Sequence, residues 1–204
     1  MPDNAARVRR MAGADLEAVV DTHLRSFPNF FLTFLGRGFL RLLYEALARD
    51  PEAIVVVAEV DGAVQGFAAG VERQAGFYSR LIETRRWAFA REAAAALLRR
   101  PGIAPRLLRA LRRPSEAGAA AAEACLMSIA VRPDAGGGGL GVRLMGEFSR
   151  ELKARGARAF CLTTDRDGNE RVNSFYRKGG GRLSRSFVTA EGRAMNEYVF
   201  DLEE

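Results

Sequence analysis

A run of glycines between an apolar segment and an amphipathic helix is the feature that most limits what this chain folds into. It reads AVRPDAGGGGLGVRL over residues 130–144. A buried strand is predicted before it, at 125–131, and Leu144 and Phe148 follow at helical spacing. Strand, glycine-rich turn and helix in this order aim backbone N–H groups at a phosphate or pyrophosphate. We therefore predict an anion site at residues 136–141, with a flexible turn as the alternative.

The composition is that of a chain that folds, and it excludes several classes of protein. The 204 residues are 48% hydrophobic and 27% charged, unlike disordered, collagen-like or disulfide-scaffold proteins. No apolar run approaches the ~20 residues that a membrane span needs. The first segment, MPDNAARVRR, lacks an apolar stretch of signal-peptide length, and two cysteines, Cys125 and Cys161, are too few to indicate an oxidised scaffold. These features favour a cytoplasmic location.

Hydrophobic periodicity predicts helices and strands along the whole chain, and we find no internal repeat. Asp61-Gly62 between two β-branched runs is a type I′ hairpin signal, and Gly156 is expected to end the helix after the glycine run. Residues 117–124 read as a small-residue linker. The predicted strands are 8–11, 53–60, 64–71, 125–131, 159–164 and a closing pair at 187–188 and 197–202. The first predicted helix starts at Asp15 and is interrupted by Pro28, and the second runs from residue 31 to the residue before Asp50. The other predicted helices are 78–113, with a break at Pro101-Gly102, 140–154 and 169–176.

The glycine run has to be compared with two known phosphate-binding motifs, the dinucleotide fingerprint and the Walker loop. Gly136-x-Gly138-x-x-Gly141 matches the dinucleotide fingerprint, and Asp165 ends the next strand, about where a ribose-binding acid belongs. However, too few strand–helix units follow for a dinucleotide fold, and residues 131–135 lengthen the turn. A Walker loop is excluded because neither Lys nor Ser/Thr follows the last glycine.

Two motifs together resemble the GNAT acyltransferase superfamily. The first is I-A-V-x-P followed by x-x-x-G-x-G, in which Gly139 and Gly141 match the family's two glycines. The second is Asn169-x-x-Val172-x-x-Phe175-Tyr176-x-x-x-Gly180, close to the family's N-x-x-A-x-x-F-Y-x-x-x-G. The resemblance implies one α/β (α+β) domain over residues 1–204, with a mixed, mostly antiparallel central sheet flanked by helices. It places a helical insertion, about 73–123, between the third and fourth strands.

The chain departs from the family pattern at three places. Gly136 stands where the family usually has Gln or Arg, so one side-chain contact to the phosphates is missing. Gly181 replaces the aromatic residue that usually follows the last glycine. The insertion at 73–123 takes the place of a short connection, and its effect on the acceptor site is open.

The resemblance also implies an N-acetyltransferase that moves an acetyl group from acetyl-CoA to a primary amine, without a metal. The strand at 126–131 is expected to diverge from its neighbour and free backbone N–H groups for the thioester and the pantetheine arm. Tyr176 is implied as the proton donor to the departing thiolate, because a phenol with a pKa near 10 stays neutral at pH 7. Asn169 is implied at the pantetheine amide, but is also a candidate N-cap. The implied cofactor-binding residues are Ile129, Val131, Gly136, Gly137, Gly138, Gly139, Leu140, Gly141, Val142 and Asn169.

No general base is evident from the sequence. The candidates for the base or the acceptor site are His23, Asp21 and Glu123, with Glu72 at the end of another strand. An amino-sugar amine titrates nearer neutrality than that of lysine and needs no dedicated base. The segment HLRSFPNFFLTFLGRGFL faintly resembles GNAT proteins of surface-polysaccharide pathways, so an amino sugar is the first expectation for the acceptor.

The net charge of +6 comes almost entirely from arginine, and many arginines lie in the insertion. We expect this segment to cover the acceptor pocket or form a homodimer contact, because Phe89, Ala93 and Leu97 make an apolar face that needs a partner. Nucleic acid is not expected as a partner. The alternative functions are a non-enzymatic module that holds an acidic partner through its arginine-rich helices and, third, a dinucleotide-binding oxidoreductase. The arginines concerned are Arg80, Arg85, Arg86, Arg91, Arg99, Arg100, Arg106, Arg109, Arg112 and Arg113.

Overall fold

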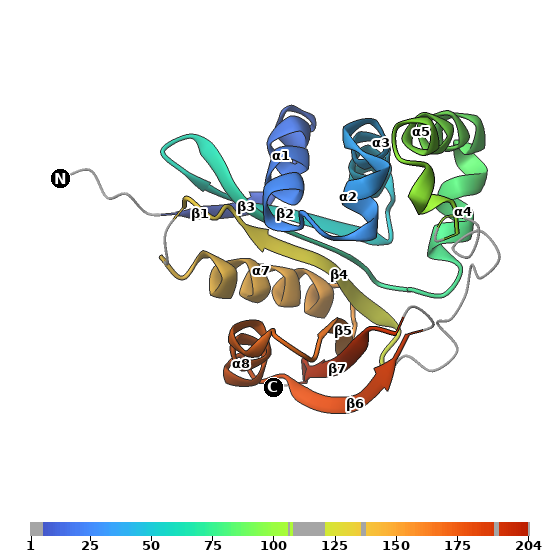
Figure 1. Cartoon of the computed structure of the whole chain (residues 1–204). Coiled ribbons are helices and arrows are strands. Elements are labelled where there is room, and N and C mark those ends of the chain that lie inside the picture. Colours follow the sequence, from blue (N-terminus) through green and yellow to red (C-terminus); the bar gives the residue numbers. More distant parts are fainter. Residues whose placement is uncertain (1–5, 106, 108–120, 136–137, 190–191, 204) are drawn as a thin grey trace.

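The computed structural model describes residues 6–105, 107, 121–135, 138–189 and 192–203 (Figure 1). Its seven strands form one sheet in the order β1-β2-β3-β4-β5-β7-β6, in which only the β4–β5 pair is parallel. The predicted mixed, mostly antiparallel sheet is confirmed. The strands are β1 (Arg7–Arg10), β2 (Ala53–Val60), β3 (Ala63–Val71), β4 (Ala124–Val131), β5 (Ala159–Asp165), β6 (Arg182–Val188) and β7 (Ala194–Asp201).

Helices cover both faces of the sheet (Figure 1). One layer consists of α1 to α5, and the other of α7 and α8. Two separate apolar cores follow from this arrangement, one around Tyr44 and Phe67 beneath the first layer, and one around Phe148 and Phe160 beneath the second. The helices are α1 (Leu16–Ser26), α2 (Phe31–Leu35), α3 (Arg37–Arg49), α4 (Phe77–Thr84), α5 (Arg86–Arg99), α7 (Leu140–Ala154) and α8 (Glu170–Lys178), with single 3₁₀ turns at Gly13–Asp15 and Pro101–Ile103.

Local sequence signals predicted several elements correctly. The hairpin between β2 and β3 turns through Asp61 and Gly62, whose φ angles of 52° and 74° are both positive, as a type I′ turn requires. Helix α7 spans residues 140–154 as predicted, and Gly156 follows it with φ of 82°. These elements were predictable because each depends on residues adjacent in sequence.

Three predictions on element boundaries were wrong. The predicted helix from residue 31 is two helices, because Gly36 adopts a φ of 88° between α2 and α3. The helix expected from residue 78 is interrupted at Arg85, which separates α4 from α5. Strand β6 begins at Arg182, five residues before the predicted start at 187. The sequence did not indicate this start because residues 182–186 of the edge strand are all exposed and show no alternation of apolar and polar side chains.

The described part of the insertion extends the first helical layer. Phe89 of α5 packs edge-on against Phe39 of α3, with ring centroids 5.1 Å apart. Ala96 is buried with Leu35 of α2 and Ile103. The apolar face of α5 that carries Phe89 therefore packs against α2 and α3 within the chain. Predicted features at residue 106 and within 108–120 lie outside the described residues.

Candidate active site

The sheet opens between its two parallel strands. Strands β4 and β5 pair at only two positions, Ala124 with Phe160 and Cys125 with Cys161, and the ladder ends there. On its other side β4 pairs with β3, and Met127 is an extra residue between the rungs of Leu126 and Ser128. A bulge of this kind bends and twists its strand. The second half of β4 consequently diverges from β5, as Figure 1 shows.

Backbone donors of β4 face this opening. The amide N–H of Arg132 donates to the carbonyl of Gln65, 2.8 Å away, on the β3 side. Successive residues of a strand direct their amides to opposite sides, so Ile129 and Val131 direct theirs toward β5. Within the described residues, no rung of the β4–β5 ladder lies beyond Cys125. The two N–H groups are therefore donors that a ligand in the opening can use.

The glycine run enters helix α7 close to this opening. Gly139 is the N-cap of α7 in a left-handed conformation, with φ of 71°. Leu140 is buried and anchors the helix, whereas Val142 in the first turn is 65% exposed. The guanidinium of Arg143, in the first turn of α7, donates to the carbonyl of Ala6, 2.9 Å away. The expected contacts of Gly136 and Gly137 lie outside the described residues.

An ion pair holds the segment before the glycines. The Arg132 guanidinium donates two hydrogen bonds to the carboxylate of Asp134, at 3.0 and 2.8 Å. These bonds lower the pKa of Asp134 to about 2. The turn between β4 and the loop thus keeps this ion pair throughout the physiological pH range.

Tyr176 brings a phenol to the second core. Its ring lies 5.8 Å from that of Tyr198 and 6.4 Å from that of Phe200, and burial raises its pKa to about 12. Its hydroxyl has no hydrogen-bond partner in the described part of the chain. Among described side chains the only fully buried polar atom without a partner is Nε2 of His23, so the Tyr176 hydroxyl retains contact with solvent.

Phe175 and Tyr176 are placed differently from what their spacing predicts. Consecutive side chains of a helix diverge by about 100°, which predicts Phe175 in the core and Tyr176 at the cleft. Instead, Tyr176 is only 7% exposed, whereas Phe175 is half-buried. The ring of Phe175 lies 3.5 Å from the point where a Cβ atom on Gly141 would be. The phase of α8 thus directs Phe175 toward the start of α7.

Asn169 and Asn173 fasten α8 to the end of β5. The side-chain amide of Asn169 donates to Oγ1 of Thr164 at 2.8 Å and to the carbonyl of Asp165 at 3.1 Å. Asn169 is the N-cap residue of α8, as predicted, but its side chain makes no capping hydrogen bond. Its Oδ1 accepts no hydrogen bond from a described residue, which leaves an acceptor for a pantetheine amide.

Asn173 is a residue that the sequence analysis missed. It is buried, and its amide donates to the carbonyls of Asp165 and Asn169, both at 2.9 Å. Its Oδ1 accepts from Asn196 and from the hydroxyl of Tyr198, both at 2.9 Å. The available signal was its position four residues after Asn169 and three before Tyr176, which places it on the same helical face.

His23 is a buried neutral histidine. Its Nδ1 lies 2.7 Å from the hydroxyl of Tyr44, and its ring contacts those of Phe27 and Phe67. Burial lowers its pKa to about 4, so the imidazole is uncharged at neutral pH. These aromatic contacts give the residue a packing role in the first core.

One carboxylate candidate for a base lies away from the opening. Glu123 precedes Ile129 by six residues, which is about 20 Å of extended strand, so it is not placed to reach the freed N–H groups. Asp21 on α1 forms an ion pair with Arg37, and its charge also contributes to the raised pKa of Arg132, which follows β4. Asp21 therefore stays a candidate on the α1 side of the site.

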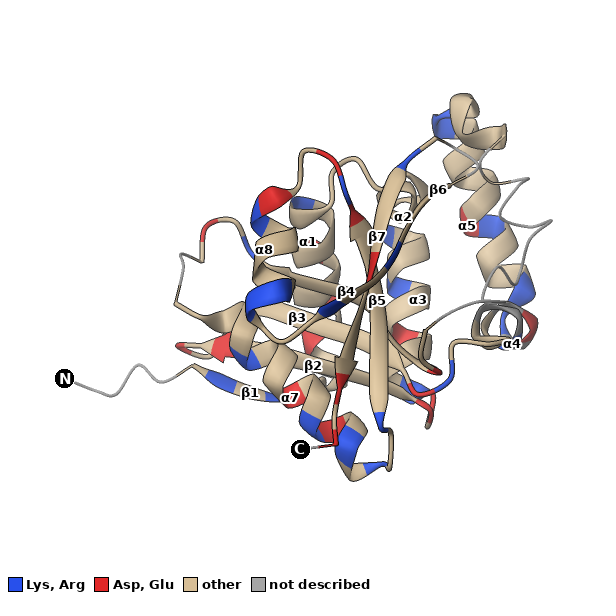
Figure 2. Cartoon of the chain, turned by 90° about the horizontal axis from the view of Figure 1, so that it is seen from below, with Lys and Arg blue, Asp and Glu red and all other residues tan. Residues whose placement is uncertain are grey.

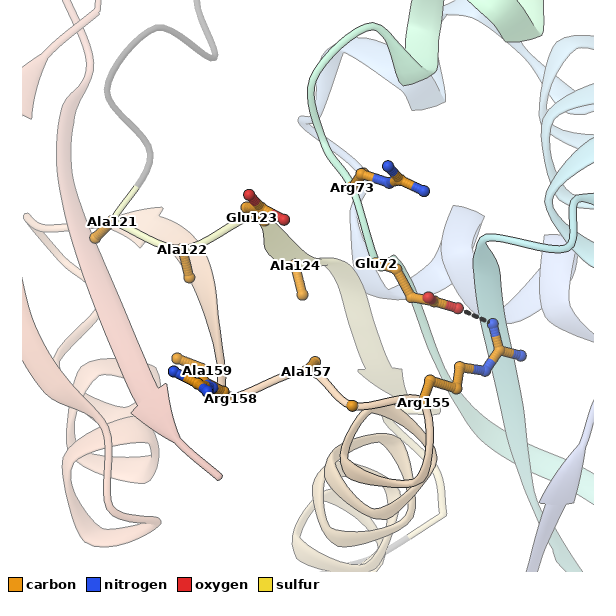
Figure 3. A pocket seen from close by; sticks show the side chains of 11 residues that line it. Glu72, Arg73, Ala121, Ala122, Glu123, Ala124, Arg155, Ala157, Arg158 and Ala159 are labelled. Atoms are coloured by element: carbon orange, nitrogen blue, oxygen red, sulfur yellow. Dashed lines mark hydrogen bonds and ion pairs between the residues drawn. The ribbon is translucent and has the colours of Figure 1, made fainter. Parts of the chain in front are cut away.

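Glu72 and Glu123 instead border a cavity of about 510 Å³ beside the first residues of β4 and β5, at the opposite end of these strands from the opening. Figure 3 shows it between the first residues of β4 and β5, with Glu72 paired to Arg155 at the end of α7. Its other charged groups, Arg73 and Arg158, are paired with Glu52 and Glu203. The cavity is separate from the glycine loop, which lies at the other end of α7.

Two further ion pairs lie on the β5–β7 part of the sheet. Glu197 of β7 is buried opposite Thr163 of β5, and Arg185 of β6 donates to its carboxylate at 2.9 Å. Arg193, near the start of β7, binds both carboxylate oxygens of Asp165, at 2.7 and 2.8 Å. The sequence did not reveal these pairs because their members are 12 and 28 residues apart. Within the described residues, no cluster of three or more His, Cys, Asp or Glu side chains could hold a metal ion.

Comparison with known proteins identifies the family. A sequence profile described as the acetyltransferase (GNAT) family matches residues 16–181. No curated protein matches the sequence. Solved structures do match: an N-acetyltransferase from Staphylococcus aureus Mu50 has 18% identity and a TM-score of 0.63, with 98% of this chain and 99% of that chain covered.

Two more structures show the same fold. The ribosomal-protein-S18-alanine N-acetyltransferase of Escherichia coli has 14% identity and a TM-score of 0.61, covering 98% of this chain and 96% of its own. The protein yncA of Salmonella typhimurium, solved with its cofactor acetyl-CoA, has 14% identity and a TM-score of 0.62, covering 98% and 95%.

The profile match and the mixed sheet define an acyltransferase fold. The chain belongs to the GNAT acetyltransferase family, whose enzymes use acetyl-CoA. The sheet, with one parallel pair, excludes the doubly wound dinucleotide-binding alternative. No helix in the described ranges is long and apolar enough to cross a membrane.

Proposed function

We propose that this protein transfers the acetyl group of acetyl-CoA to a primary amine, and that the opening between β4 and β5 is the site of transfer. The observation that carries the proposal is the early end of the β4–β5 ladder, which leaves the N–H groups of Ile129 and Val131 facing an unpaired gap. In this proposal they bind the pantetheine arm and the thioester oxygen, on which negative charge develops during acyl transfer.

The pyrophosphate is assigned to the start of α7. The N-terminus of a 15-residue helix offers several unpaired N–H groups and the positive end of its dipole. The exposed side chain of Val142 lies in the same turn, where a bound cofactor would cover it. Leu140 and Gly141 complete this turn, and Asn169 offers its free Oδ1 to the pantetheine amide.

Tyr176 is proposed to donate a hydrogen bond to the departing sulfur. A phenol with a pKa of about 12 retains its proton at any physiological pH. An ordinary thiol titrates near ~8.5, so complete transfer of this proton to the thiolate is unfavourable by roughly 3 pKa units, unless burial also raises the pKa of the thiol. The proposal therefore assigns to Tyr176 chiefly the stabilisation of the leaving thiolate.

Two connecting segments meet on the other side of the opening and are proposed to border the acceptor. Phe30, between α1 and α2, lies under the guanidinium of Arg193 at 5.1 Å, and Arg193 binds Asp165 at the end of β5. The hydroxyl of Ser26 also donates to the carbonyl of Val131 at 3.3 Å. An amine that enters between these segments reaches the end of the opening.

The class of amine is left broad in this proposal. The neighbour from Escherichia coli is named for a ribosomal-protein alanine, which supports nitrogen as the nucleophile in this fold. Nothing among the described contacts supports the amino sugar expected from the phenylalanine-rich segment. A homodimer, a single domain over residues 1–204 and a cytoplasmic location stay predictions.

The experiment is a panel of amines incubated with acetyl-CoA and the protein. The panel contains amino sugars, small polyamines, aminoglycosides and peptides with free N-termini. Release of free CoA thiol is followed, and the acetylated product is identified by mass spectrometry. We expect amine-dependent thiol release with at least one class. Binding of acetyl-CoA without acetylation of any panel member would contradict the proposal for primary amines.

A further inference from the structure

The excess of positive over negative charge in this protein lies in its insertion. Residues 73–123 contain eleven arginines and four acidic residues, whereas the rest of the chain contains 20 basic and 21 acidic residues. The net charge of +6 therefore arises wholly from this quarter of the sequence. A charge asymmetry of this size indicates a surface that attracts an anionic partner.

The outer face of α5 adds apolar side chains to this charge. Trp87 is 78% exposed and Leu98 is 87% exposed, more than any other large hydrophobic side chain of the described residues. Ala90 and Ala94 lie between them and are also exposed. The four residues fall on one side of the helix and span about 16 Å. The opposite side of α5 carries Phe89 and packs on α3, so the outer face is oriented away from the core.

Arginine side chains border this apolar row. The guanidinium of Arg86 lies 5.6 Å from the ring centroid of Trp87, and the exposed side chain of Arg91 lies on the same face. Arg99 and Arg100 follow Leu98, but their guanidinium groups turn toward the α2 side of the helix: that of Arg100 lies 5.5 Å from the ring centroid of Phe34, and that of Arg99 lies beside Gly36. The arginines that border the apolar row are therefore Arg86 and Arg91. Figure 2 shows α4 and α5 projecting from the sheet, with basic segments along α5.

We propose that the outer face of α5 binds the surface of an anionic lipid bilayer. Tryptophan prefers the level of the lipid headgroups, leucine enters the acyl boundary, and arginine binds the phosphates. Two large apolar side chains are too few for a protein interface, which needs roughly 800 Å² on each partner. A nucleic acid would use the arginines but would leave Leu98 in water. Helix α7 lies on the other face of the sheet (Figure 1), so docking through α5 leaves the glycine loop accessible.

The protein carries its own probe for this proposal, because Trp87 is its only tryptophan. The full chain is titrated with vesicles of phosphatidylcholine that contain about a third phosphatidylglycerol, and with vesicles of phosphatidylcholine alone. We expect a blue shift of the tryptophan emission with the anionic vesicles only. The shift should disappear when salt is raised from about 0.1 M to about 1 M, because screening then shortens the reach of the arginines.

Vesicle sedimentation of variants identifies the surface. Leu98→Ala and Trp87→Ala should each lower binding about tenfold, which is the loss expected from one apolar side chain at the boundary. Val188→Ala removes another exposed apolar side chain, 63% exposed, from β6 and should bind as the wild type does. Acetyl-CoA affinity should be unchanged in all three variants, which shows that they fold.

Several results would overturn the proposal. These are an absence of binding to anionic vesicles, equal binding to neutral vesicles, or binding that Leu98→Ala leaves intact. An emission shift produced by duplex RNA or DNA but not by vesicles would assign the face to nucleic acid. A shift that appears on concentrating the protein alone would assign it to a second copy of the chain.

Discussion

Tyr176 combines a ring packed in the second core with a hydroxyl that has no described partner. Tyr176→Phe keeps the ring and removes only the hydroxyl. We expect turnover to fall ~10²-fold, because one proton or hydrogen-bond donor to the leaving group is lost, whereas acetyl-CoA affinity stays unchanged. Steady-state kinetics and calorimetry measure the two quantities. Wild-type turnover in the variant would show that the thiolate leaves without this group.

Tyr198→Phe is the matched control for that substitution. Its hydroxyl donates to Oδ1 of the buried Asn173, and it lies in the same aromatic cluster. Losing this bond should lower the free energy of unfolding by about 1 kcal/mol, with turnover retained. A loss of turnover equal to that of Tyr176→Phe would mean that the catalytic effect is only a disturbance of the cluster.

His23 should make the stability of the protein depend on pH. Its pKa is about 4 in the folded state, lowered by burial from 6.5, so the unfolded chain binds its proton more readily. Stability is then complete above the unfolded pKa and declines as the pH falls toward 4. Between about pH 7 and about pH 5 we expect a loss of roughly 2 kcal/mol.

Urea unfolding at both pH values measures this loss, and His23→Phe, which keeps an aromatic ring in the core, is the comparison. The variant should lose at most a small part of its stability between the two pH values. An equally steep decline in the variant would assign the pH dependence to other groups.

At the scale of residues, the sequence predicts contacts only within a motif. Tyr176 and Asn169 could be singled out because they lie seven residues apart in a recognisable motif. The partners of Asn173 and Glu197 could not, since they come from β5, β6 and β7 and are set by strand register. A buried polar network is visible only when those strands are assembled.

Helix α7 allows a test of the pyrophosphate site with two glycines of one helix. Gly141 lies in the first turn, and a Cβ there would lie 3.5 Å from the ring of Phe175, an ordinary contact. Gly141→Ala should therefore fold, but its methyl group obstructs close approach of a phosphate. We expect acetyl-CoA affinity to fall roughly tenfold, equivalent to ~1.4 kcal/mol. Calorimetry with acetyl-CoA measures the change.

Gly146→Ala is the control, because Gly146 lies in the middle of α7 and a Cβ there meets no atom within 4 Å. An alanine in a helix interior should stabilise the fold by about 0.5–1 kcal/mol without affecting acetyl-CoA. Equal affinity of both variants and the wild type would remove the start of α7 from the site.

Periodicity predicted elements with at least one buried face, but it missed an exposed edge strand and a break between two helices. Strands β2 and β3 and helix α7 were predicted almost to the residue. Edge strand β6 has no buried face over residues 182–186, so it gave no signal. The break at Gly36 was missed because apolar residues continue at helical spacing on both sides of it.

The whole molecule should be stabilised by acetyl-CoA and not by NAD⁺. A ligand at about 100 times its dissociation constant adds roughly 2.7 kcal/mol to the free energy of unfolding. For a chain of this length that corresponds to a rise in melting temperature of about 5–10 °C. Thermal unfolding with each ligand gives the answer. A rise with NAD⁺ and none with acetyl-CoA would contradict the assignment of acetyl-CoA as the co-substrate.

The overall architecture was predictable to the extent that the family motifs fix element order. The opening of the sheet was expected from the resemblance alone, because a bulge at Met127 depends on the register between β3 and β4. The packing of α5 on α2 and α3 was also missed, since the apolar face of α5 does not specify which partner covers it.

A crystal structure of the protein with acetyl-CoA tests the central claim most directly. We predict the pyrophosphate at residues 138–141, the pantetheine arm along the unpaired part of β4, and the thioester oxygen within hydrogen-bond distance of the N–H of Ile129 or Val131. The hydroxyl of Tyr176 should lie near the sulfur. Acetyl-CoA bound elsewhere, for example in the cavity beside Glu72 and Arg155, with no ligand in the opening between β4 and β5, would contradict the account.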